Sequence, residues 1–276
     1  MDRRLTPANA RVALDTLRGI IDAPRFTGGE PAQVARPLVD LLRAPAGPRE
    51  RQLLLGDAVT VIEREAGWAF VQAAKDGYCG YLPEDSLSEA QPVTHHIVTP
   101  GTHAYSGPKV QAPEIMPLYL GARVEVHSVS GAWAETAQGH VPTAHLLPLD
   151  QRLEDPAAVA MGFLHTPYLW GGNSRAGIDC SGLVQGAFRA CGIDMPADSD
   201  LQSACGVAVP ENEALRRNDL LFWKGHVAIA LGPGRMVHAT AAFMAVVEED
   251  ILPAITRIEA SGGGPVTHRR RIMAAV

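Results

Sequence analysis

The chain has 276 residues, which is enough for two or three compact domains with separate cores. Its hydrophobic fraction of 46% and charged fraction of 20% are typical of an ordinary globular protein. A formal net charge of −6 gives no electrostatic reason to expect a nucleic-acid partner.

The N-terminal segment has charge but lacks the apolar core of a signal peptide. No continuous apolar stretch approaches the roughly 18 residues of a membrane span. We therefore expect a cytoplasmic protein with no membrane partner, although export by a non-standard route stays open. The sequence leaves the oligomeric state undetermined.

The cysteines and histidines give no sign of a metal site. Four cysteines, at positions 79, 180, 191 and 205, form neither a metal-ligand spacing nor a disulfide framework, and free thiols fit a reducing compartment. His95, His96 and His103 cluster, but no cysteine or carboxylate completes a ligand set at the usual spacing. We expect no metal or organic cofactor, and we expect Cys79, Cys191 and Cys205 to be small buried hydrophobes.

An internal repeat organises the first half of the chain. Residues 53–61 match residues 118–126 at an offset of 65, which holds through Trp68 and Trp133 and then shortens to 59. Each copy alternates apolar and polar residues and is interrupted by glycine turns, which predicts two small antiparallel β-barrels. The copies resemble bacterial SH3-type (SH3b) domains, placed at residues 29–92 and 93–150. Residues 1–28 precede them as an extension, in which spaced apolar residues predict a short amphipathic helix packed on a neighbouring domain.

The last domain is expected over residues 151–276. Helices are predicted at 157–164 and 181–190, separated by a glycine-rich loop. Strands are predicted at 220–223, 227–231 and 236–239, with a tight turn between the last two. Helices that precede an antiparallel sheet indicate an α+β domain. The short basic run at 269–271 is expected to be a solvated terminal strand.

Cys180 is the candidate nucleophile. It stands where the second predicted helix begins, and a helix N-terminus stabilises a thiolate. Asp179 is a good N-cap, and Ser181 and Gly182 leave the first turn uncrowded. A buried structural cysteine explains the position about equally well.

His226 and His238 are the candidate partners of the thiol. His226 begins an apolar strand, where a polar ring needs a reason to be, and His238 follows on the adjacent predicted strand. Neighbouring strands can bring the two rings within hydrogen-bonding distance, so that His238 fixes the tautomer of His226. Each histidine taken alone is more simply a core residue bonded to a backbone carbonyl.

Together these residues resemble the NlpC/P60 family of papain-like cysteine peptidases. The motifs that match are Pro-Tyr-x-Trp-Gly-Gly at 167–172, Asp-Cys-Ser-Gly-Leu-Val at 179–184, Asn-Asp-Leu at 218–220, Gly-His-Val-Ala-Ile at 225–229 and Val-His-Ala at 237–239. The resemblance implies an α+β papain-like catalytic domain after the two SH3-like barrels. It also implies that Cys180 is the nucleophile, His226 the base and His238 the orienting residue. The hydroxyl of Tyr168 would join the Cys180 N–H in binding the oxyanion.

The pairing with SH3b repeats is similar to the γ-D-glutamyl-L-diamino acid endopeptidases, or dipeptidyl-peptidase VI type, of murein peptide recycling. That resemblance implies cleavage of free stem peptides, release of L-Ala-D-Glu and a requirement for a free N-terminal amine. Asp198-Ser199 occupy the place of the family's amine-binding acidic residue. A solvated loop aspartate is the alternative. The residues predicted to contact substrate are Asp179, Ser181, Asp198, Ser199 and Tyr78.

Two details of substrate binding stay open. Tyr78 is favoured over Tyr81 as a contact, and either Glu50 or Asp57 is a candidate second acid at the amine. The segment 196–198 lacks the arginine that relatives often carry before the aspartate, so the partner of the substrate carboxylate and the choice between lysine and diaminopimelate are undetermined. Two rival functions are a secreted peptidoglycan hydrolase that binds the wall through SH3b modules, and a catalytically inactive peptide-binding protein.

Overall fold

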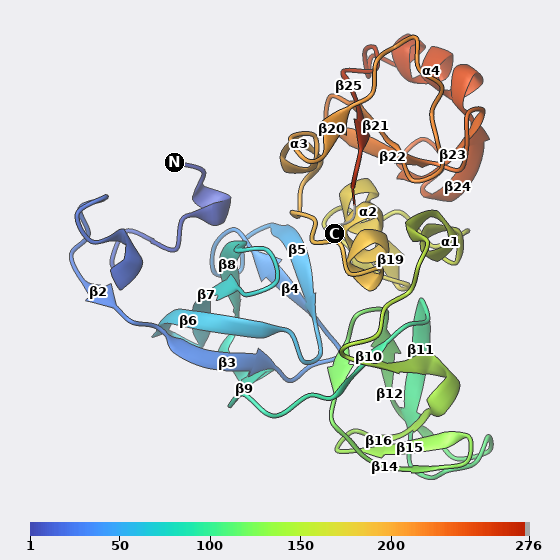
Figure 1. Cartoon of the computed structure of the whole chain (residues 1–276). Helices are drawn as coiled ribbons and strands as arrows, with labels where there is room; N and C mark the ends of the chain where they lie inside the picture. The colour runs from blue at the N-terminus through green and yellow to red at the C-terminus, as the bar shows by residue number, and fades with distance from the viewer. Residues whose placement is uncertain (274–276) are drawn as a thin grey trace. The chain divides into compact units, whose positions relative to one another are not determined.

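The computed structural model describes residues 1–273 of the chain, and it divides into two compact units (Figure 1). Unit 1 consists of Met1–Ile97 and Thr102–Leu149, and unit 2 consists of Val98–Gly101 together with the chain from Asp150 onward. Unit 1 is built of strands, whereas unit 2 combines helices with a sheet.

The first β-region of unit 1 is a seven-stranded antiparallel sheet. Its members are β3 (Glu30–Val34), β4 (Leu38–Leu42), β5 (Arg49–Leu54), β6 (Ala58–Glu65), β7 (Trp68–Ala73), β8 (Cys79–Pro83) and β9 (Leu87–Ser88). Their order in the sheet is β5-β4-β8-β7-β6-β3-β9. Alternate residues turn inward, as with Val59 and Val61 of β6, so the period-two pattern of the sequence becomes the core.

The second β-region contains eight strands in two sheets. They are β10 (His95–Ile97), β11 (Gly101–Tyr105), β12 (Glu114–Tyr119), β13 (Arg123–Val124), β14 (Val126–Ser130), β15 (Trp133–Thr136), β16 (Gly139–Pro142) and β17 (Leu146–Pro148). One sheet has the order β12-β11-β16-β15-β14 and the other β13-β10-β17. Leu54 and Leu55 of the first region are buried in the same apolar cluster as Ile97, Leu118 and Val141. The two β-regions therefore share a core.

The same cross-strand pairs recur in the two β-regions. Trp68 lies opposite Pro83 across β7 and β8, and Trp133 lies opposite Pro142 across β15 and β16. A 3₁₀ turn follows each of these prolines, and the next short strand, β9 or β17, pairs back with β3 or β10.

A bulge recurs at equivalent positions of the repeat. The ladder shifts between Val61 and Glu63 in the first region and between Val126 and Ser128 in the second. These positions are separated by the same 65 residues that relate the two sequence repeats. Because a bulge bends a strand and increases its twist, both hairpins are bent at the same place.

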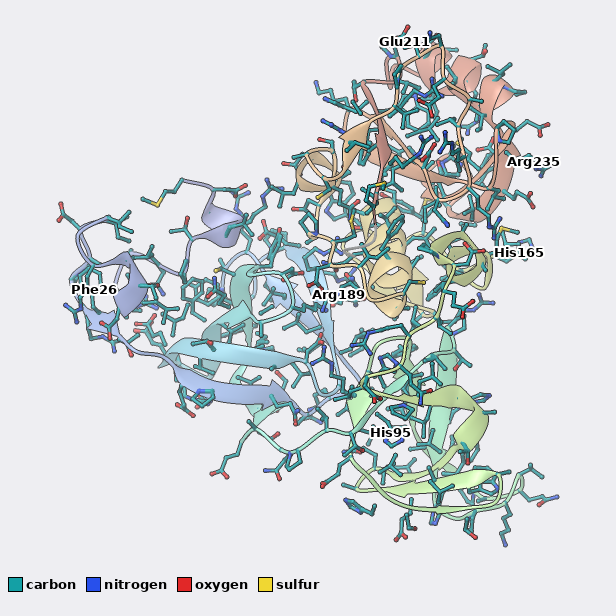
Figure 2. The ribbon with its side chains drawn as sticks, viewed as in Figure 1. Phe26, His95, His165, Arg189, Glu211 and Arg235 are labelled. Carbon is teal, nitrogen blue, oxygen red and sulfur yellow. The ribbon has the colours of Figure 1, made fainter. Side chains whose placement is uncertain are left out.

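The N-terminal extension corrects one prediction, because the expected amphipathic α-helix in residues 1–28 is absent. The segment instead has 3₁₀ turns at Arg3–Leu5 and Asp15–Leu17 and a two-stranded parallel pair, β1 (Ala13–Leu14) with β2 (Phe26–Thr27). Val12 and Leu14 pack in a cluster with Ile62, Phe70 and Cys79, so the apolar residues do cover the neighbouring sheet. These residues belong to an extended segment, in which side chains two residues apart lie on the same face. Phe26 lies in this segment (Figure 2). The Arg18 guanidinium is stacked over its ring, 4.7 Å from the ring centroid.

Unit 2 contains a six-stranded sheet and four helices. The helices are α1 (Pro156–Met161), α2 (Cys180–Ala190), α3 (Ser199–Gln202) and α4 (Ile251–Ala260). The sheet has the order β20-β25-β21-β22-β23-β24, formed by β20 (Val207–Ala208), β21 (Leu220–Trp223), β22 (His226–Ala230), β23 (Arg235–Thr240), β24 (Ala245–Asp250) and β25 (His268–Arg271). A small hairpin of β18 (Asn173–Ser174) and β19 (Gly177–Ile178) precedes α2.

The helices and central strands of unit 2 follow the sequence predictions closely. The first helix ends at Met161, earlier than expected, and the second begins one residue earlier, at Cys180 itself. Helix α4 was not anticipated; it packs on the sheet through a cluster that includes Met236, Ile251 and Ala254.

The terminal basic run is part of a strand as predicted, but its arginines are half-buried rather than fully solvated. Strand β25 lies inside the sheet between β20 and β21. Arg271 makes a bidentate ion pair with the buried Asp219, with contacts of 2.8 and 2.7 Å. Arg269 donates to the carbonyls of Pro210 and Glu211. These guanidiniums therefore tie β25 to the segment between Pro210 and Asp219.

Candidate active site

Cys180 is the first residue of α2, and the side chain of Asp179 fixes that helix start. The Oδ1 atom of Asp179 accepts from the Gly182 N–H at 2.7 Å and from the Ser181 hydroxyl at 3.1 Å, while Oδ2 accepts from the Gly171 N–H at 2.8 Å. One carboxylate therefore joins the glycine-rich turn to the first turn of the helix. Cys180 is 6% exposed and stands at the positive end of the helix, which favours a thiolate.

Glycines allow the turn and the helix to approach each other. A Cβ on Gly182 would lie 2.4 Å from the Gly172 carbonyl oxygen, and a Cβ on Gly172 would lie 2.5 Å from the Gly177 carbonyl oxygen. Gly171 has a φ of +70°, which residues with a side chain rarely adopt. Close backbone packing around Cys180 therefore requires glycine at these positions.

His226 and His238 lie side by side on the adjacent strands β22 and β23. The distance from His226 Nε2 to His238 Nδ1 is 2.8 Å, and the ring centroids are 5.0 Å apart. The ring of Trp223 is 5.6 Å from that of His226. Helix α2 packs against both strands, so the helix that begins at Cys180 and the histidine pair belong to one packed assembly.

Two further residues extend the histidine pair, and the sequence analysis did not identify them. His238 Nε2 lies 2.7 Å from Oε2 of Glu249, and Arg257 Nη2 donates to the same oxygen at 2.6 Å. Glu249 is on β24 and Arg257 on α4. Their only sequence signal is an acidic run at 248–250 beside a helix, which gives no hint of a site until β23 is paired with β24.

Electrostatics keep the His226 ring neutral and the Glu249 carboxylate charged. Burial, to which the cation of Arg257 adds, lowers the pKa of His226 far below its usual value and leaves a neutral imidazole near pH 7. Hydrogen bonding from His238 is the main cause that lowers the pKa of Glu249, and Arg257 adds to it. A neutral ring can accept the proton of a thiol.

Tyr168 lies next to the turn that precedes Cys180. Its N–H donates to the Met244 carbonyl at 2.9 Å, and it forms a β-bridge with Ile178, two residues before Cys180. Burial, with added effects of Cys180 and Asp179, raises the pKa of Tyr168 above its usual value. Its hydroxyl therefore stays protonated and can donate a hydrogen bond, as an oxyanion ligand must.

Asp198 and Ser199 are half-buried at the start of the short helix α3. Gln202, which is fully buried, connects this loop to α2: its Nε2 atom lies within 3.0 Å of the carbonyl oxygens of Ser181, Pro196 and Ala197. The loop that carries Asp198 is thus attached to Ser181, the residue after Cys180. Sequence reasoning did not single out Gln202.

The predicted substrate contacts of unit 1 differ in their surroundings. Tyr78 is 3% exposed, whereas Tyr81 is half-buried with its ring 4.9 Å from that of Phe70. Asp57 is engaged internally, because its Oδ2 accepts from the Leu54 N–H at 2.9 Å and from Lys75 at 2.8 Å. Glu50 pairs with Arg3 through Oε1, while its Oε2 has no hydrogen-bond partner among the described residues.

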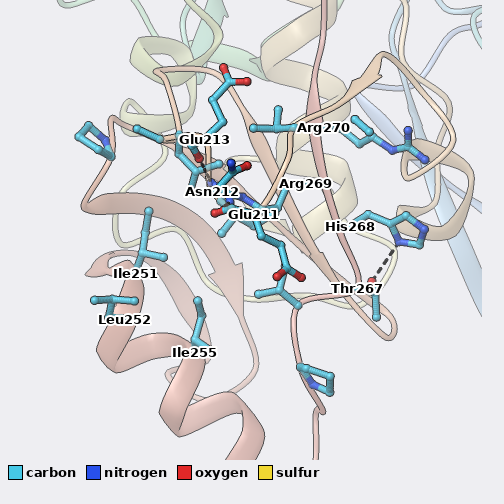
Figure 3. Close-up of a pocket in the computed structure, with 18 of the residues that line it drawn as sticks. Glu211, Asn212, Glu213, Ile251, Leu252, Ile255, Thr267, His268, Arg269 and Arg270 are labelled. Atoms are coloured by element: carbon cyan, nitrogen blue, oxygen red, sulfur yellow. Dashed lines mark hydrogen bonds between the residues drawn. The ribbon is translucent and has the colours of Figure 1, made fainter.

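A cavity of about 810 Å³ in unit 2 contains none of the predicted site residues. Its walls come from the loop at 208–215, from α4 and from the segment around β25 (Figure 3). Over residues 1–273, no group of three or more His, Cys, Asp or Glu side chains is arranged to hold a metal ion. Within the same range, no helix has the length and hydropathy to cross a membrane.

Comparison with known families gives two matches along the chain. The NlpC/P60 family model matches residues 165–251, which include Cys180, His226, His238 and Glu249. The model described as the bacterial dipeptidyl-peptidase Sh3 domain matches residues 41–87. One SH3 domain is therefore shown, and the second, at 93–150, stays a prediction.

Curated relatives align over most of the chain. A γ-D-glutamyl-L-lysine dipeptidyl-peptidase of Bacillus cereus is 30% identical over 251 residues, covering 76% of this chain and 72% of the relative. An enzyme of the same name from Bacillus subtilis is 31% identical, covering 69% and 72%. The solved structure of an NlpC/P60 family protein from Bacillus cereus superposes with a TM-score of 0.75 at 22% identity, over 88% of this chain and 99% of that chain, which shows a common fold.

Proposed function

The chain belongs to the NlpC/P60 family and is a cysteine-type peptidase, and we propose that it hydrolyses the γ-D-glutamyl–L-diamino acid bond of free murein stem peptides, releasing L-Ala-D-Glu. The observation that carries the proposal is the 2.8 Å contact between His226 and His238 in a domain whose helix starts at Cys180. Two relatives that align over more than two thirds of this chain bear the name γ-D-glutamyl-L-lysine dipeptidyl-peptidase.

The proposed reaction proceeds through a thioester. Cys180 attacks the γ-glutamyl carbonyl while His226 takes the thiol proton, and the carbonyl oxygen becomes an oxyanion bound by the Cys180 N–H and the Tyr168 hydroxyl. His226 then gives the proton to the diamino-acid nitrogen as the C–N bond breaks. Water, with His226 again as base, hydrolyses the thioester and releases L-Ala-D-Glu. The proposal requires no metal or organic cofactor.

We propose that Asp198 recognises the free N-terminal amine of the substrate, with Ser199 beside it. A half-buried carboxylate forms a strong charge-assisted hydrogen bond with an ammonium group. Gln202 supports this assignment because it ties the loop at 196–198 to Ser181. Asp179 and Ser181 serve the substrate site by fixing the turns around it.

Glu50 is the better of the two candidate acids in the SH3 domain. Asp57 stabilises its own turn through Leu54 and Lys75, whereas Glu50 has a carboxylate oxygen with no partner among residues 1–273. Glu50 therefore stays the favoured of the two candidate acids that the sequence predicts, and Tyr78 stays the predicted aromatic contact.

We further propose that residues 93–150 are a second SH3b domain. The support is structural: both β-regions place a tryptophan opposite a proline, follow it with a 3₁₀ turn, and carry a bulge at the same repeat position. The proposed domain limits stay at 1–28, 29–92, 93–150 and 151–276.

The test compares three substrates: the free tripeptide L-Ala-γ-D-Glu-L-Lys or its diaminopimelate counterpart, the same peptide with an acetylated N-terminus, and purified sacculi. We expect cleavage of the free peptide and a fall in kcat/KM of about 100-fold or more on acetylation, because loss of a buried charge pair costs ~2–5 kcal/mol. Asp198→Asn should raise KM for the free peptide. The matched control is Asp200→Asn, at an exposed position two residues further on.

Equal cleavage of free and acetylated peptides, together with digestion of sacculi, would contradict the recycling role. That outcome would support the alternative of a wall hydrolase, for which a peptidoglycan endopeptidase of Mycobacterium tuberculosis, 33% identical over 128 residues, is a precedent. A role inside the cell is part of the same proposal and depends on this preference for free peptides.

A further inference from the structure

Three hydrogen bonds link four side chains from three strands and a helix. They join His226 Nε2 to His238 Nδ1 at 2.8 Å, His238 Nε2 to Glu249 Oε2 at 2.7 Å, and Arg257 Nη2 to Glu249 Oε2 at 2.6 Å. His238 is 1% exposed, so no water competes for its ring nitrogens at these distances. The chain of contacts continues past the residue that orients the base and ends at an ion pair.

The hydrogen positions in this series of hydrogen bonds can be assigned by starting from Glu249 and Arg257. Glu249 is held as a carboxylate by Arg257, and a carboxylate only accepts hydrogen bonds. His238 must therefore carry its hydrogen on Nε2, and a neutral imidazole has one N–H, so His238 Nδ1 is an acceptor. His226 must then donate from Nε2, which leaves the lone pair of His226 Nδ1 for the Cys180 thiol.

We propose that Glu249 is a positioning residue that fixes the tautomers of both histidines and so makes His226 a competent base. With the opposite arrangement, His238 would donate from Nδ1 to His226 Nε2, and the hydrogen of His226 would sit on Nδ1. That ring could not accept the proton of Cys180. Glu249 touches neither substrate nor thiol and acts only through His238.

Arg257 keeps the carboxylate in its role. Its guanidinium lies 5.0 Å from the Phe243 ring and pairs with Glu249. In the acylation step, the Sγ proton of Cys180 moves to His226 Nδ1, and the His226 Nε2–H continues to donate to His238. Glu249 takes no proton, since Arg257 stabilises its charge. The negative charge of Glu249 acts on His226 through His238 and stabilises the imidazolium that forms there, in the way that the carboxylate of a catalytic triad does.

Strand geometry supplies a matched control for the test. Glu248 and Glu249 are neighbours on β24, and successive residues of a strand point to opposite faces. Glu248 pairs with Arg235 at 2.8 Å, and Arg235 lies at the periphery of unit 2 (Figure 2). Glu248→Gln removes the same charge one residue away without touching the histidines.

The first experiment uses the unmodified protein. Long-range ¹H–¹⁵N NMR of the imidazoles, with signals assigned by His226→Asn and His238→Asn, reports which nitrogen of each ring is protonated. We expect Nε2–H on both rings at neutral pH. A His238 ring protonated at Nδ1 would overturn the proposal, and this result needs neither a substrate nor a folded Glu249 variant.

The second experiment compares Glu249→Gln with Glu248→Gln. A glutamine can accept from or donate to His238 Nε2, so it no longer dictates one tautomer. We expect a mixture of His238 tautomers and a fall in kcat of about 10- to 100-fold with little change in KM, less than the ~10⁴-fold loss when a group that contacts the base itself is replaced.

Two results of that comparison would contradict the proposal. One is a kcat for Glu249→Gln equal to that of Glu248→Gln; the other is a lower kcat with unchanged tautomers, which would indicate a purely structural role. The kinetic arm depends on the peptidase activity, but the NMR arm does not depend on the substrate proposed above. A wrong substrate would therefore leave the tautomer result intact.

Discussion

Cys180, the proposed nucleophile, and His226, the proposed base, are held by different means. The backbone fixes Cys180: a helix start, an N-cap carboxylate and glycines packed against carbonyl oxygens within 2.4–2.5 Å of where a Cβ would lie. Side chains fix His226, through a hydrogen-bonded chain that ends at Arg257. The difference predicts two kinds of failure. Changes on the nucleophile's side should displace atoms, whereas changes on the base's side should redistribute protons.

Replacing the thiol is the largest change available on the nucleophile's side. Cys180→Ala should abolish cleavage of the tripeptide while leaving the melting temperature nearly unchanged, because the N-cap and the glycine contacts remain. Cys191→Ala, at the other end of the same helix, is the control and should retain activity. Measurable turnover by Cys180→Ala would show that another residue supplies the nucleophile.

The second-largest effect is expected from adding a side chain at Gly182. Gly182→Ala places a Cβ 2.4 Å from the Gly172 carbonyl oxygen, so the turn or the helix must shift. We expect a loss of unfolding free energy of about 1–3 kcal/mol and a fall in kcat of about 100-fold if Cys180 moves by ~1 Å.

Thermal melts and steady-state kinetics measure both effects of that substitution. Gly234→Ala is the control, because nothing lies within 4 Å of its added Cβ. Full activity of Gly182→Ala would mean that the close approach of turn and helix does not position the thiol.

The smallest expected effect is a shift in pH dependence on the base's side. Burial and the Arg257 cation lower the pKa of His226, and Glu249 raises it. The neutral base therefore persists below the usual histidine pKa of ~6.5, and the acid limb of kcat/KM should lie below that pH. Arg257→Gln removes a cation and leaves Glu249 less compensated. Both changes raise the pKa of His226, so the acid limb should move to higher pH.

Arg235→Gln is the control for the pH profile, since Arg235 pairs with Glu248 and Asp250 away from the histidines. A limb that stays in place in Arg257→Gln, or moves to lower pH, would contradict the electrostatic account of the base.

The same contrast explains what could be predicted from sequence. The nucleophile's side is local: Asp179, Cys180 and Gly182 are adjacent in the chain, and helix and cap signals fall on them. His226 and His238 were accessible because a short turn joins their strands. Glu249 was not, because its place beside His238 depends on the register of β24, in which Met236 and not His238 lies directly opposite Glu249. Gln202 is hidden for the same reason, as its partners are backbone carbonyls that no sequence pattern marks.

The fold shows similar limits. Alternation and repeat spacing indicated β-structure over residues 29–150, and strands are found there. The N-terminal segment was wrongly predicted as a helix because spaced apolar residues also suit an extended chain that covers a sheet. Helix α4 was missed although it carries Arg257, since Pro253 near its start resembles a break; a proline is tolerated in the first turn of a helix.

The central claim is that Cys180, activated by the His226–His238 pair, carries the acyl group of the substrate. Rapid quenching of the protein during turnover of L-Ala-γ-D-Glu-L-Lys, followed by mass spectrometry of its peptides, tests this claim directly. We expect a mass increase on the Cys180 peptide equal to L-Ala-D-Glu minus water, absent from Cys180→Ala. An acyl adduct on another residue, or single-turnover cleavage by Cys180→Ala, would contradict it.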